Sequence, residues 1–370
     1  MGADTHKLTA SERTWLEVRT YMREHRSWLD TVAVESYPNI GRVAETPLLT
    51  RQEWIPPVPL RLEEIDLELV STRLDEAGAR LDGSSCLPTR DSGEPYTTYA
   101  EAVAEIAAPT VFENRPTYRL LGADLTTSPP ILRFGLGTYF DSINVGEAAA
   151  HEFALAQRGH AVAASVREAI SDPCDPAQRP INLAISTLTI RREPETGAKS
   201  FLLHWRDPRK VGHAGGMYQV VPVGIFQPSG YANWNIGNDF SLWHNMVREL
   251  AEELRGDTED HGSENAPIDY AAWPFASRLD QARREGTLAV YCLGLGVDPL
   301  TYATDLLTAV VIDAPVFDSL FGAAVTNNAE GRLLELQPFS AERVQEILDH
   351  HPVQAAGNAV LRLATAAVFD

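Results

Sequence analysis

Three glutamates within five residues, Glu249, Glu252 and Glu253, have the residue type and the spacing needed to bind a divalent metal ion. Side chains three or four residues apart on a helix lie about 5–6 Å from each other, so these carboxylates can converge. Apolar residues recur at helical spacing on the opposite side and predict one helix over residues 238–255. That apolar stripe consists of Phe240, Trp243, Val247, Leu250 and Leu254. Because Mg²⁺ prefers oxygen ligands and usually keeps substrate phosphates as further ligands, the stretch indicates metal-assisted chemistry on a phosphate or pyrophosphate.

An acidic helix face also has a simpler interpretation, in which the carboxylates are merely solvated. Like charges at this spacing destabilise a helix by only about 0.2–0.5 kcal/mol per pair. Such repulsion is too weak to require a bound cation. The glutamates alone therefore leave a solvated surface open as an alternative, and the surrounding sequence has to decide between the two.

The overall composition is that of a globular protein without nucleic-acid-binding character. The 370 residues exceed one typical domain and predict two domains, or one domain with large additions. The net charge of −20 argues against a nucleic-acid partner, because phosphate neutralisation needs clustered Lys and Arg. The three cysteines are widely spaced and indicate neither a disulfide framework nor a metal site, which fits a cytoplasmic location. We expect no secretory signal and no membrane span, because no apolar run reaches the roughly 18 residues that a span requires.

Hydrophobic periodicity predicts an α/β protein in two parts, with a break near residues 170–180 where proline follows aspartate twice. The first part, residues 1–175, is expected to be a helical and mixed α+β region. Its predicted helices cover 9–31, 63–80, 101–108 and 147–160, and its predicted strands cover 117–121 and 131–134. The second part, residues 176–370, alternates strands and helices. Its predicted strands cover 182–190, 200–205, 217–226, 288–293, 306–312 and 333–336, and its predicted helices 238–255, 273–285, 340–350 and 355–367.

The second part resembles a Nudix hydrolase domain over residues 180–365. Residues 248–253, Arg-Glu-Leu-Ala-Glu-Glu, match the Arg-Glu-U-x-Glu-Glu core of the family's signature box position by position, where U is an aliphatic residue. Residues 221–224, Val-Pro-Val-Gly, resemble the segment that usually enters the box. Residues 328–335, followed by Phe339, resemble the acidic strand and aromatic residue near the end of the family's domain. The resemblance implies a Nudix-like α/β/α sandwich with a mixed sheet.

Two positions depart from the family's box. The first glutamate of the box should stand eight residues before Arg248, where this chain has Phe240. The later glycine of the box should stand at Arg255, whereas the nearest glycine is Gly256, one residue further on. The stretch between Gly224 and Arg248 is also longer than the family's usual spacing.

The resemblance assigns roles to the residues of the matching core. It implies that Mg²⁺ or Mn²⁺ is bound by Glu249, Glu252 and Glu253, and that Arg248 supports one of these ligands. A further carboxylate commonly acts as a base, so Glu253 and Glu335 are candidate catalytic residues. The other candidates for this base are Glu330, Glu264 and Glu259. A solvated surface position is the favoured interpretation of Glu335, Glu330, Glu264 and Glu259, and Glu335 is the best candidate base among them.

Candidate substrate-binding residues lie on either side of the predicted helix. Phe226, Tyr231 and Trp234 could stack on a base or sugar, although packing against the first part of the chain would also explain them. Arg206, with Arg209 and Lys210 beyond it, could contact phosphate, although pairing with the chain's many acids is the alternative.

The leading functional hypothesis is metal-dependent hydrolysis of a pyrophosphate bond in a nucleoside-diphosphate-linked metabolite, such as a dinucleotide, ADP-ribose-like compound or nucleotide sugar. The expected partner is this small-molecule substrate, and a homodimer of the chain is a further hypothesis. The departures at Phe240 and Arg255 favour an alternative, a non-catalytic Nudix-like sensor of a nucleotide-type metabolite. A regulatory or interaction protein with an acidic docking surface is the third hypothesis.

Overall fold

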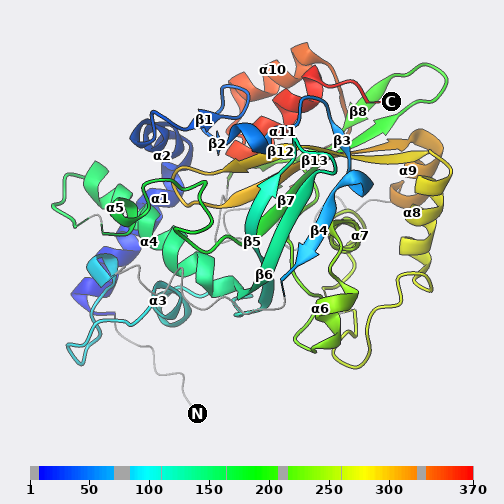
Figure 1. Cartoon of the computed structure of the whole chain (residues 1–370). Helices are drawn as coiled ribbons and strands as arrows, with labels where there is room; N and C mark the ends of the chain where they lie inside the picture. Colours follow the sequence, from blue (N-terminus) through cyan, green and yellow to red (C-terminus); the bar gives the residue numbers. More distant parts are fainter. Residues whose placement is uncertain are drawn as a thin grey trace.

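The chain folds around a mixed sheet that helices cover on both faces (Figure 1). The computed structural model describes residues 8–70, 84–109, 111–163, 165–206, 216–259, 261–322 and 331–369. The described strands include a nine-stranded sheet whose main path is β1-β2-β12-β13-β7-β8-β15. β11 pairs with β7, and β3 pairs with β12, beside this path. The expected α/β class is confirmed.

The centre of the sheet is formed by β7 (Leu183–Arg192), β12 (Leu288–Val297) and β13 (Thr304–Asp313). β13 runs parallel to β7 and antiparallel to β12, which makes the sheet mixed. Every residue of β12 and β13 is buried. Strands buried on both faces lack the polar alternation of half-exposed strands, which explains their continuous apolar sequences.

Alternate residues of the central strands enter two different cores. Val290 and Val310 belong to the core that contains the buried residues of helix α7 (Leu242–Leu250), whereas Tyr291 and Val311 belong to the core that contains those of the C-terminal helices. These C-terminal helices are α10 (Ala341–His350) and α11 (Ala355–Ala366), and they lie on the face opposite α7 in Figure 1. The period of two along each strand therefore places helices on both faces of the sheet.

The first part of the chain contributes to the same structure as the second. The short strands β1 (Gly41–Arg42), β2 (Leu49–Thr50) and β3 (Leu60–Arg61) extend the central sheet through β2 and β3, which pair with β12. β4 (Asp66–Leu69), β5 (Pro116–Asp124) and β6 (Ile131–Thr138) form a separate three-stranded sheet. Residues from both sides of position 175 share one hydrophobic core, while the domain boundary predicted there stays a prediction.

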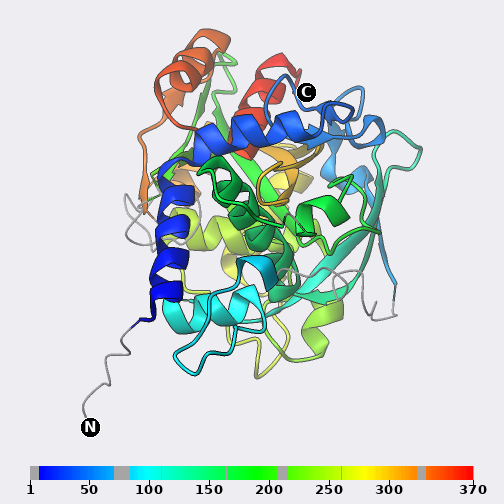
Figure 2. The same ribbon diagram turned by 90° about the vertical axis from the view of Figure 1, so that its left-hand side faces the viewer.

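Helices of the first part border one side of the molecule (Figure 2). They are α1 (Ala10–Glu24), α2 (Arg26–Ala33), α3 (Tyr99–Ile106), α4 (Tyr139–Gln157) and α5 (Ser165–Ala169). The first predicted helix is in fact two, because His25 leaves helical geometry between α1 and α2. α1 and α3 both pack against α4.

The predicted helix over residues 63–80 is wrong where the structure describes it. Residues Leu62–Glu64 form a short 3-10 turn, and Asp66–Leu69 form β4, which runs parallel to β6. Leu67 and Leu69 are less exposed than Asp66 and Glu68, so the burial has a period of two rather than that of a helix. Residues 71–83 of the predicted helix lie outside the described part of the chain.

The remaining elements of the second part are mostly short. The predicted strand over 200–205 is divided into β8 (Lys199–Phe201) and β9 (His204–Arg206). The predicted strand over 217–226 is divided into β10 (Tyr218–Gln219) and β11 (Val223–Ile225). The other elements are α8 (Pro274–Arg284), α9 (Ala314–Phe321), β14 (Gly331–Leu333) and β15 (Gln337–Pro338). Among the helices that the structure describes, none has the length and apolarity required to cross a membrane.

The predicted acidic helix is preceded by a separate turn of helix and changes its geometry near its end. After α6 (Trp234–Asn238) the chain bends, and α7 (Leu242–Leu250) begins where the Ser241 side chain accepts a hydrogen bond from the backbone N–H of His244. The helix continues as a π-helical turn over Ala251–Arg255 and ends at Gly256, whose φ of 77° is left-handed. The predicted apolar stripe is confirmed, because four of its residues lie in the core and Phe240 packs against it.

Loss of one residue of this stripe tests how strongly the helix is held. Leu250 is fully buried between α7 and the sheet, so Leu250→Ala should lower the free energy of unfolding by about 2–5 kcal/mol. Leu336→Ala is the control, because Leu336 is 39% exposed and its loss should change stability by no more than about 0.5 kcal/mol. Urea unfolding followed by fluorescence measures both variants. Equal effects would contradict the assigned packing of α7.

Candidate functional site

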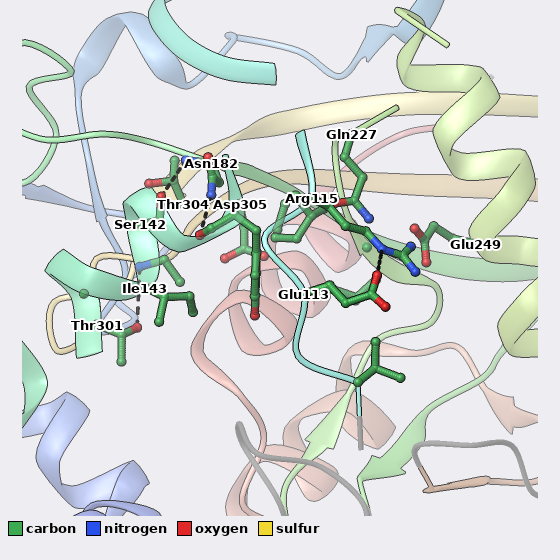
Figure 3. A pocket seen from close by; sticks show the side chains of 18 of the residues that line it. Glu113, Arg115, Ser142, Ile143, Asn182, Gln227, Glu249, Thr301, Thr304 and Asp305 are labelled. Carbon is green, nitrogen blue, oxygen red and sulfur yellow. Dashed lines mark hydrogen bonds and ion pairs between the residues drawn. The ribbon is translucent and has the colours of Figure 1, made fainter. Parts of the chain in front are cut away.

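A cavity of about 420 Å³ opens beside α7 and reaches the first residues of β7 and β13. Its walls come from both parts of the chain, including α4, the segment after Arg179, β11 and the π-helical turn. Figure 3 shows Glu249, Gln227, Arg115 and Glu113 toward one end and Ser142, Asn182 and Thr304 toward the other. The cavity therefore has an end near α7, called here the acidic end, and an opposite end, called the inner end.

Glu249 lines the acidic end and lies directly over the backbone of β11. A Cβ atom placed on Gly224 would overlap the carboxylate of Glu249. Only glycine leaves room for this approach of helix to strand. Glycine is therefore required at the end of the Val-Pro-Val-Gly segment, because a side chain there would displace one predicted metal ligand.

Glu252 lines the same end of the cavity from one helical turn further along. Its Oε1 atom lies 3.2 Å from Nε2 of His261, which also lines the cavity. Glu259 lines the cavity as well and forms an ion pair of 3.1 Å with Arg115. Two of the three predicted metal ligands are thus brought to one wall, together with a histidine that sequence reasoning did not select.

Glu253 has a different environment from its two neighbours. Its carboxylate is nearly buried and accepts a hydrogen bond of 2.6 Å from the backbone N–H of Val223 in β11. The other carboxylate oxygen lies 3.6 Å from Nδ1 of the buried residue His204. Glu253 does not line the cavity and joins the end of the helix to β11. It is therefore a positioning residue in this structure, beside the two glutamates that face the cavity.

Arg248 is buried and joins the helix to the loop before it. It donates hydrogen bonds to the backbone carbonyl of Gln227, at 2.7 Å, and to the Asn245 side chain, at 3.0 Å. It also donates one of 2.5 Å to the Tyr270 hydroxyl, which in turn donates to Asp239. Arg248 thus joins the helix to the preceding loop and to Tyr270, while the support of a metal ligand that the resemblance implied for it stays a prediction.

Asp239 is an acid near the start of α7 that the sequence analysis did not select as a site residue. It lies one residue before Phe240, is fully buried, and its Oδ1 is 3.7 Å from Nη1 of Arg248. Burial acts to raise the pKa of Asp239, but attraction to Arg248 and hydrogen bonds from Ser229 and Tyr270 outweigh it and hold the pKa below its usual value. The bend between α6 and α7 places this acid beside the arginine despite the shifted spacing.

The displaced box glycine also has a structural counterpart. A π-helical turn holds one more residue than the corresponding α-helical turn. The turn over Ala251–Arg255 therefore accounts for a left-handed Gly256 that follows one residue later than the family pattern expects. Both departures from the box are thus accompanied by a local change in backbone geometry.

The predicted stacking residues do not line the cavity. Phe226 is fully buried, with its ring centroid 4.5 Å from that of Tyr118, so its assignment to substrate binding is wrong and its role is to pack the core. Tyr231 and Trp234 are 52% and 46% exposed and lie outside the cavity wall. Their polar atoms bond to Glu113 and to the Ser263 carbonyl, respectively.

Of the predicted phosphate-binding residues and candidate catalytic bases, some line the cavity and others lie elsewhere. Arg206 does line the cavity and donates a hydrogen bond of 3.3 Å to Gln219. Glu335 is exposed and lies outside the wall of the cavity, so this candidate base is not brought to the site. Glu264, another candidate, accepts a hydrogen bond from the backbone N–H of Tyr231. Arg209, Lys210 and Glu330 lie outside the described residues.

The carboxylates at the acidic end suit a metal ion that the ligand helps to bind. Within the described ranges, no group of three or more His, Cys, Asp or Glu side chains is arranged to hold a metal ion. Glu249 and Glu252 nevertheless face one cavity, and the space that Gly224 leaves is occupied by one of these carboxylates. Mg²⁺ is commonly held by only one or two carboxylates plus substrate phosphates. The donor set therefore fits Mg²⁺ or Mn²⁺ in the presence of a phosphorylated ligand.

Neither a known family model nor a curated protein matches this sequence. The resemblance to Nudix hydrolases consequently rests on residues 248–253 and their surroundings.

The Asp239–Arg248 contact makes a prediction about stability and pH. Breaking a buried ion pair typically costs about 3–5 kcal/mol, so Asp239→Asn should lower the free energy of unfolding by that amount at pH 7. A carboxylate whose folded pKa is depressed stabilises the protein above its usual value of 3.8 and loses that contribution as the pH falls through the folded pKa. The difference in the free energy of unfolding between wild type and variant should therefore be constant from about pH 5 to 7 and shrink as the pH falls further. Urea unfolding at several pH values measures it.

The control for this experiment is an Asp→Asn change in a surface pair with arginine. Asp257 lies 3.8 Å from Arg255, and both side chains are partly exposed. Asp257→Asn should cost less than about 1 kcal/mol. A pH-independent effect of Asp239→Asn, or an effect no larger than that of the control, would contradict the assigned ion pair.

The contact between Gly224 and Glu249 makes a second prediction. Gly224→Ala should lower the free energy of unfolding by about 1–3 kcal/mol, because the new methyl group overlaps the carboxylate. In a Glu249→Ala background the same change should cost less, and the coupling should amount to about 0.5–3 kcal/mol. Gly237→Ala is the matched control, since nothing lies within 4 Å of a Cβ atom there. Equal costs of Gly224→Ala in both backgrounds would show that Glu249 is not over β11.

Proposed function

We propose that this protein is a Nudix-like hydrolase that uses Mg²⁺ or Mn²⁺ to cleave a pyrophosphate bond in a nucleoside-diphosphate-linked metabolite. One observation carries the proposal: Glu249 and Glu252 face the same cavity, and the helix that bears them is fixed to β11 and to the preceding loop. Two carboxylates held rigidly at the wall of a cavity form a ready site for a cation that also binds phosphate oxygens.

The roles of the residues follow from their contacts. Glu249 and Glu252 would hold the metal ion, which when bound would neutralise charge on the phosphate that leaves. Arg248 and Glu253 orient the helix, the first through the Gln227 carbonyl and the second through the Val223 N–H. Because phosphoryl transfer depends mainly on positioning and charge stabilisation, rigid placement of two carboxylates is a suitable contribution from the protein.

Two arginines in the wall of the cavity are candidates to contact an anionic ligand, of which Arg115 is also ion-paired with Glu113 and Glu259. Arg115 and Arg206 both line it, on the side of the acidic end and beside Gln219, respectively. Arginine side chains bind phosphate oxygens with two parallel hydrogen bonds. The volume of about 420 Å³ is in the range of small-molecule sites. These features support a metabolite as the substrate and not a macromolecule.

The backbone geometry supports the family assignment despite the departures in sequence. Asp239 provides the acid beside Arg248 that Phe240 cannot provide, and the π-helical turn accompanies the shift of the glycine to position 256. The mixed sheet between helices is the architecture that the resemblance implied. We propose on this basis that the second part of the chain has a Nudix-like fold.

One observation favours a second candidate function. Glu253, the third glutamate of the core, is nearly buried and bonded to Val223, so it is not directed into the cavity. A cavity with two carboxylates instead of three is also suited to a sensor that binds a nucleotide-type metabolite without cleaving it. Turnover distinguishes this alternative from the hydrolase.

The test is incubation of the protein with Mg²⁺ or Mn²⁺ and each of three compounds: ADP-ribose, a dinucleotide and a nucleotide sugar. Release of nucleoside monophosphate, measured by chromatography, is expected for at least one compound. Glu252→Gln should lower kcat/KM for that compound by at least about 100-fold, beyond the 10–100-fold typical of residues that only orient a metal ligand. Glu285→Gln, an exposed change at the end of α8, is the control and should leave the rate unchanged.

The outcomes separate the two candidates. Hydrolysis that Glu252→Gln does not reduce would contradict the assigned metal ligands. Thermal stabilisation by one of the compounds without any release would contradict the hydrolase and support the sensor. Neither binding nor release with any compound would contradict both functions.

A further inference from the structure

Arg179 lies in the wall of the cavity on the inner side, away from the acidic end. Its guanidinium donates hydrogen bonds to the carbonyl of Pro173, at 2.7 Å, and to the hydroxyl of Thr304, at 2.8 Å. A weaker one of 3.4 Å goes to the carbonyl of Pro180. Thr304 and its neighbour Asn182 mark this end of the cavity in Figure 3. These bonds use three of the five N–H donors of the side chain.

The guanidinium is buried without a negatively charged partner. Arg179 is only 2% exposed, and within the described part of the chain no carboxylate forms an ion pair with it. The carboxylate of Asp172, whose charge raises the pKa of Arg179, is instead paired with Arg51 at 2.5 Å. Burial lowers the pKa of Arg179 to about 10, so the group is still charged at neutral pH. A buried charge is normally paired, because the loss of hydration is costly.

The backbone beside Arg179 is held in an unusual conformation. Tyr302 has a φ of 57°, in the left-handed region that a bulky residue rarely adopts. Its ring lies with its centroid 5.5 Å from the guanidinium carbon of Arg179, and Tyr302 itself lines the cavity. The Tyr302 hydroxyl is hydrogen-bonded to Tyr37 at 2.7 Å, which fixes the ring in place. Strained residues of this kind are concentrated at ligand sites.

The acids at this end of the cavity do not neutralise Arg179. Glu147 lines the cavity but forms an ion pair of 2.8 Å with Arg19. Asp305 also lines the cavity and accepts a hydrogen bond of 2.7 Å from Ser186; burial raises its pKa to about 6, so its carboxylate is mostly ionised at neutral pH. Among the described residues neither carboxylate forms an ion pair with Arg179, whose guanidinium keeps two N–H donors for a ligand that enters the cavity.

We infer that the inner end of the cavity is an anion-binding subsite, in which Arg179 binds a carboxylate or phosphate group of the ligand. The chemistry shared by these groups is a compact oxyanion that accepts the two remaining N–H donors of the guanidinium. The subsite itself requires no metal ion. It rests on the proposed function only for the further statement that this anion belongs to the metabolite whose pyrophosphate lies at the acidic end.

The test measures thermal unfolding of the full-length protein in EDTA with increasing sodium phosphate, and separately with sodium acetate, against sodium chloride at equal ionic strength. The Tm should rise with one or both oxyanions beyond the effect of chloride, because a ligand of the folded state stabilises it. The larger shift identifies phosphate or carboxylate as the preferred group. Arg179→Met should weaken binding of that anion at least about tenfold and remove most of the shift.

Arg167→Met is the matched control. Arg167 also stacks on Tyr302, at 5.3 Å, and also donates to backbone carbonyls, those of Pro299 and Leu300, but it does not line the cavity. It should lower stability without changing the anion-dependent shift. Should Arg179→Met fail to fold, Arg179→Lys, which keeps the charge but loses the fork of donors, should show a reduced shift.

Two results would overturn the subsite. One is a wild-type Tm that neither oxyanion raises beyond chloride, and the other is a shift that Arg179 variants retain in full. Because EDTA removes divalent metal ions, the result does not depend on the proposed hydrolysis. Absence of hydrolysis in the assay described above, together with an Arg179-dependent shift in Tm, would contradict the proposed hydrolase and still support the anion-binding subsite.

Discussion

The close packing of α7 and its π-helical end on β11 is the constraint on which the proposed site depends. Gly224 leaves the space that the Glu249 carboxylate occupies, and the backbone N–H of Val223 holds Glu253. These contacts fix the rotation of the helix about its axis. Given that rotation, Glu249 and Glu252 face the cavity while Leu250 and Leu254 enter the core. The proposed metal site and the packing of the core thus depend on the same contacts between α7 and β11.

The cavity itself joins regions that are far apart in the sequence. Its acidic end combines the helix of the second part with Glu113 and Arg115 of the first part, and Ser142 and Gly146 come from α4 of the first part. Arg179 and Asn182 connect the two, because the chain passes from α5 into β7 through this wall. Residues of both parts also pack together in one hydrophobic core. The first part of the chain therefore shapes the cavity and is not merely attached to it.

The sequence was informative where a pattern is local. The period of the apolar residues predicted the buried face of the helix over 238–255, and the continuous apolar runs predicted β12 and β13. The helix predicted over 63–80 was wrong because β4 is stabilised by pairing with β6, more than sixty residues away. Helical propensity cannot show such a distant partner.

The site was predictable only in part for the same reason. The spacing of Glu249 and Glu252 is a local property of a helix, so their common direction could be read from the sequence. The burial of Phe226 depends on Tyr118 from the other part of the chain. The roles of Asp239 and Arg179 depend on contacts that bends and loops of the chain create, and a periodic sequence pattern does not predict such contacts. An acid in the first turn of the helix predicted over 238–255 was the one available signal for Asp239.

The central claim is that Glu249 and Glu252 bind a divalent cation together with a pyrophosphate. The most direct measurement is calorimetric titration of Mn²⁺ into the protein, with and without an α,β-methylene analogue of a nucleoside diphosphate that cannot be hydrolysed. We expect Mn²⁺ to bind much more tightly in the presence of the analogue, since phosphate oxygens complete the coordination shell. We also expect this enhancement to be lost in the variant with both Glu249→Gln and Glu252→Gln. Equal binding of Mn²⁺ by the wild type and this variant would contradict the account.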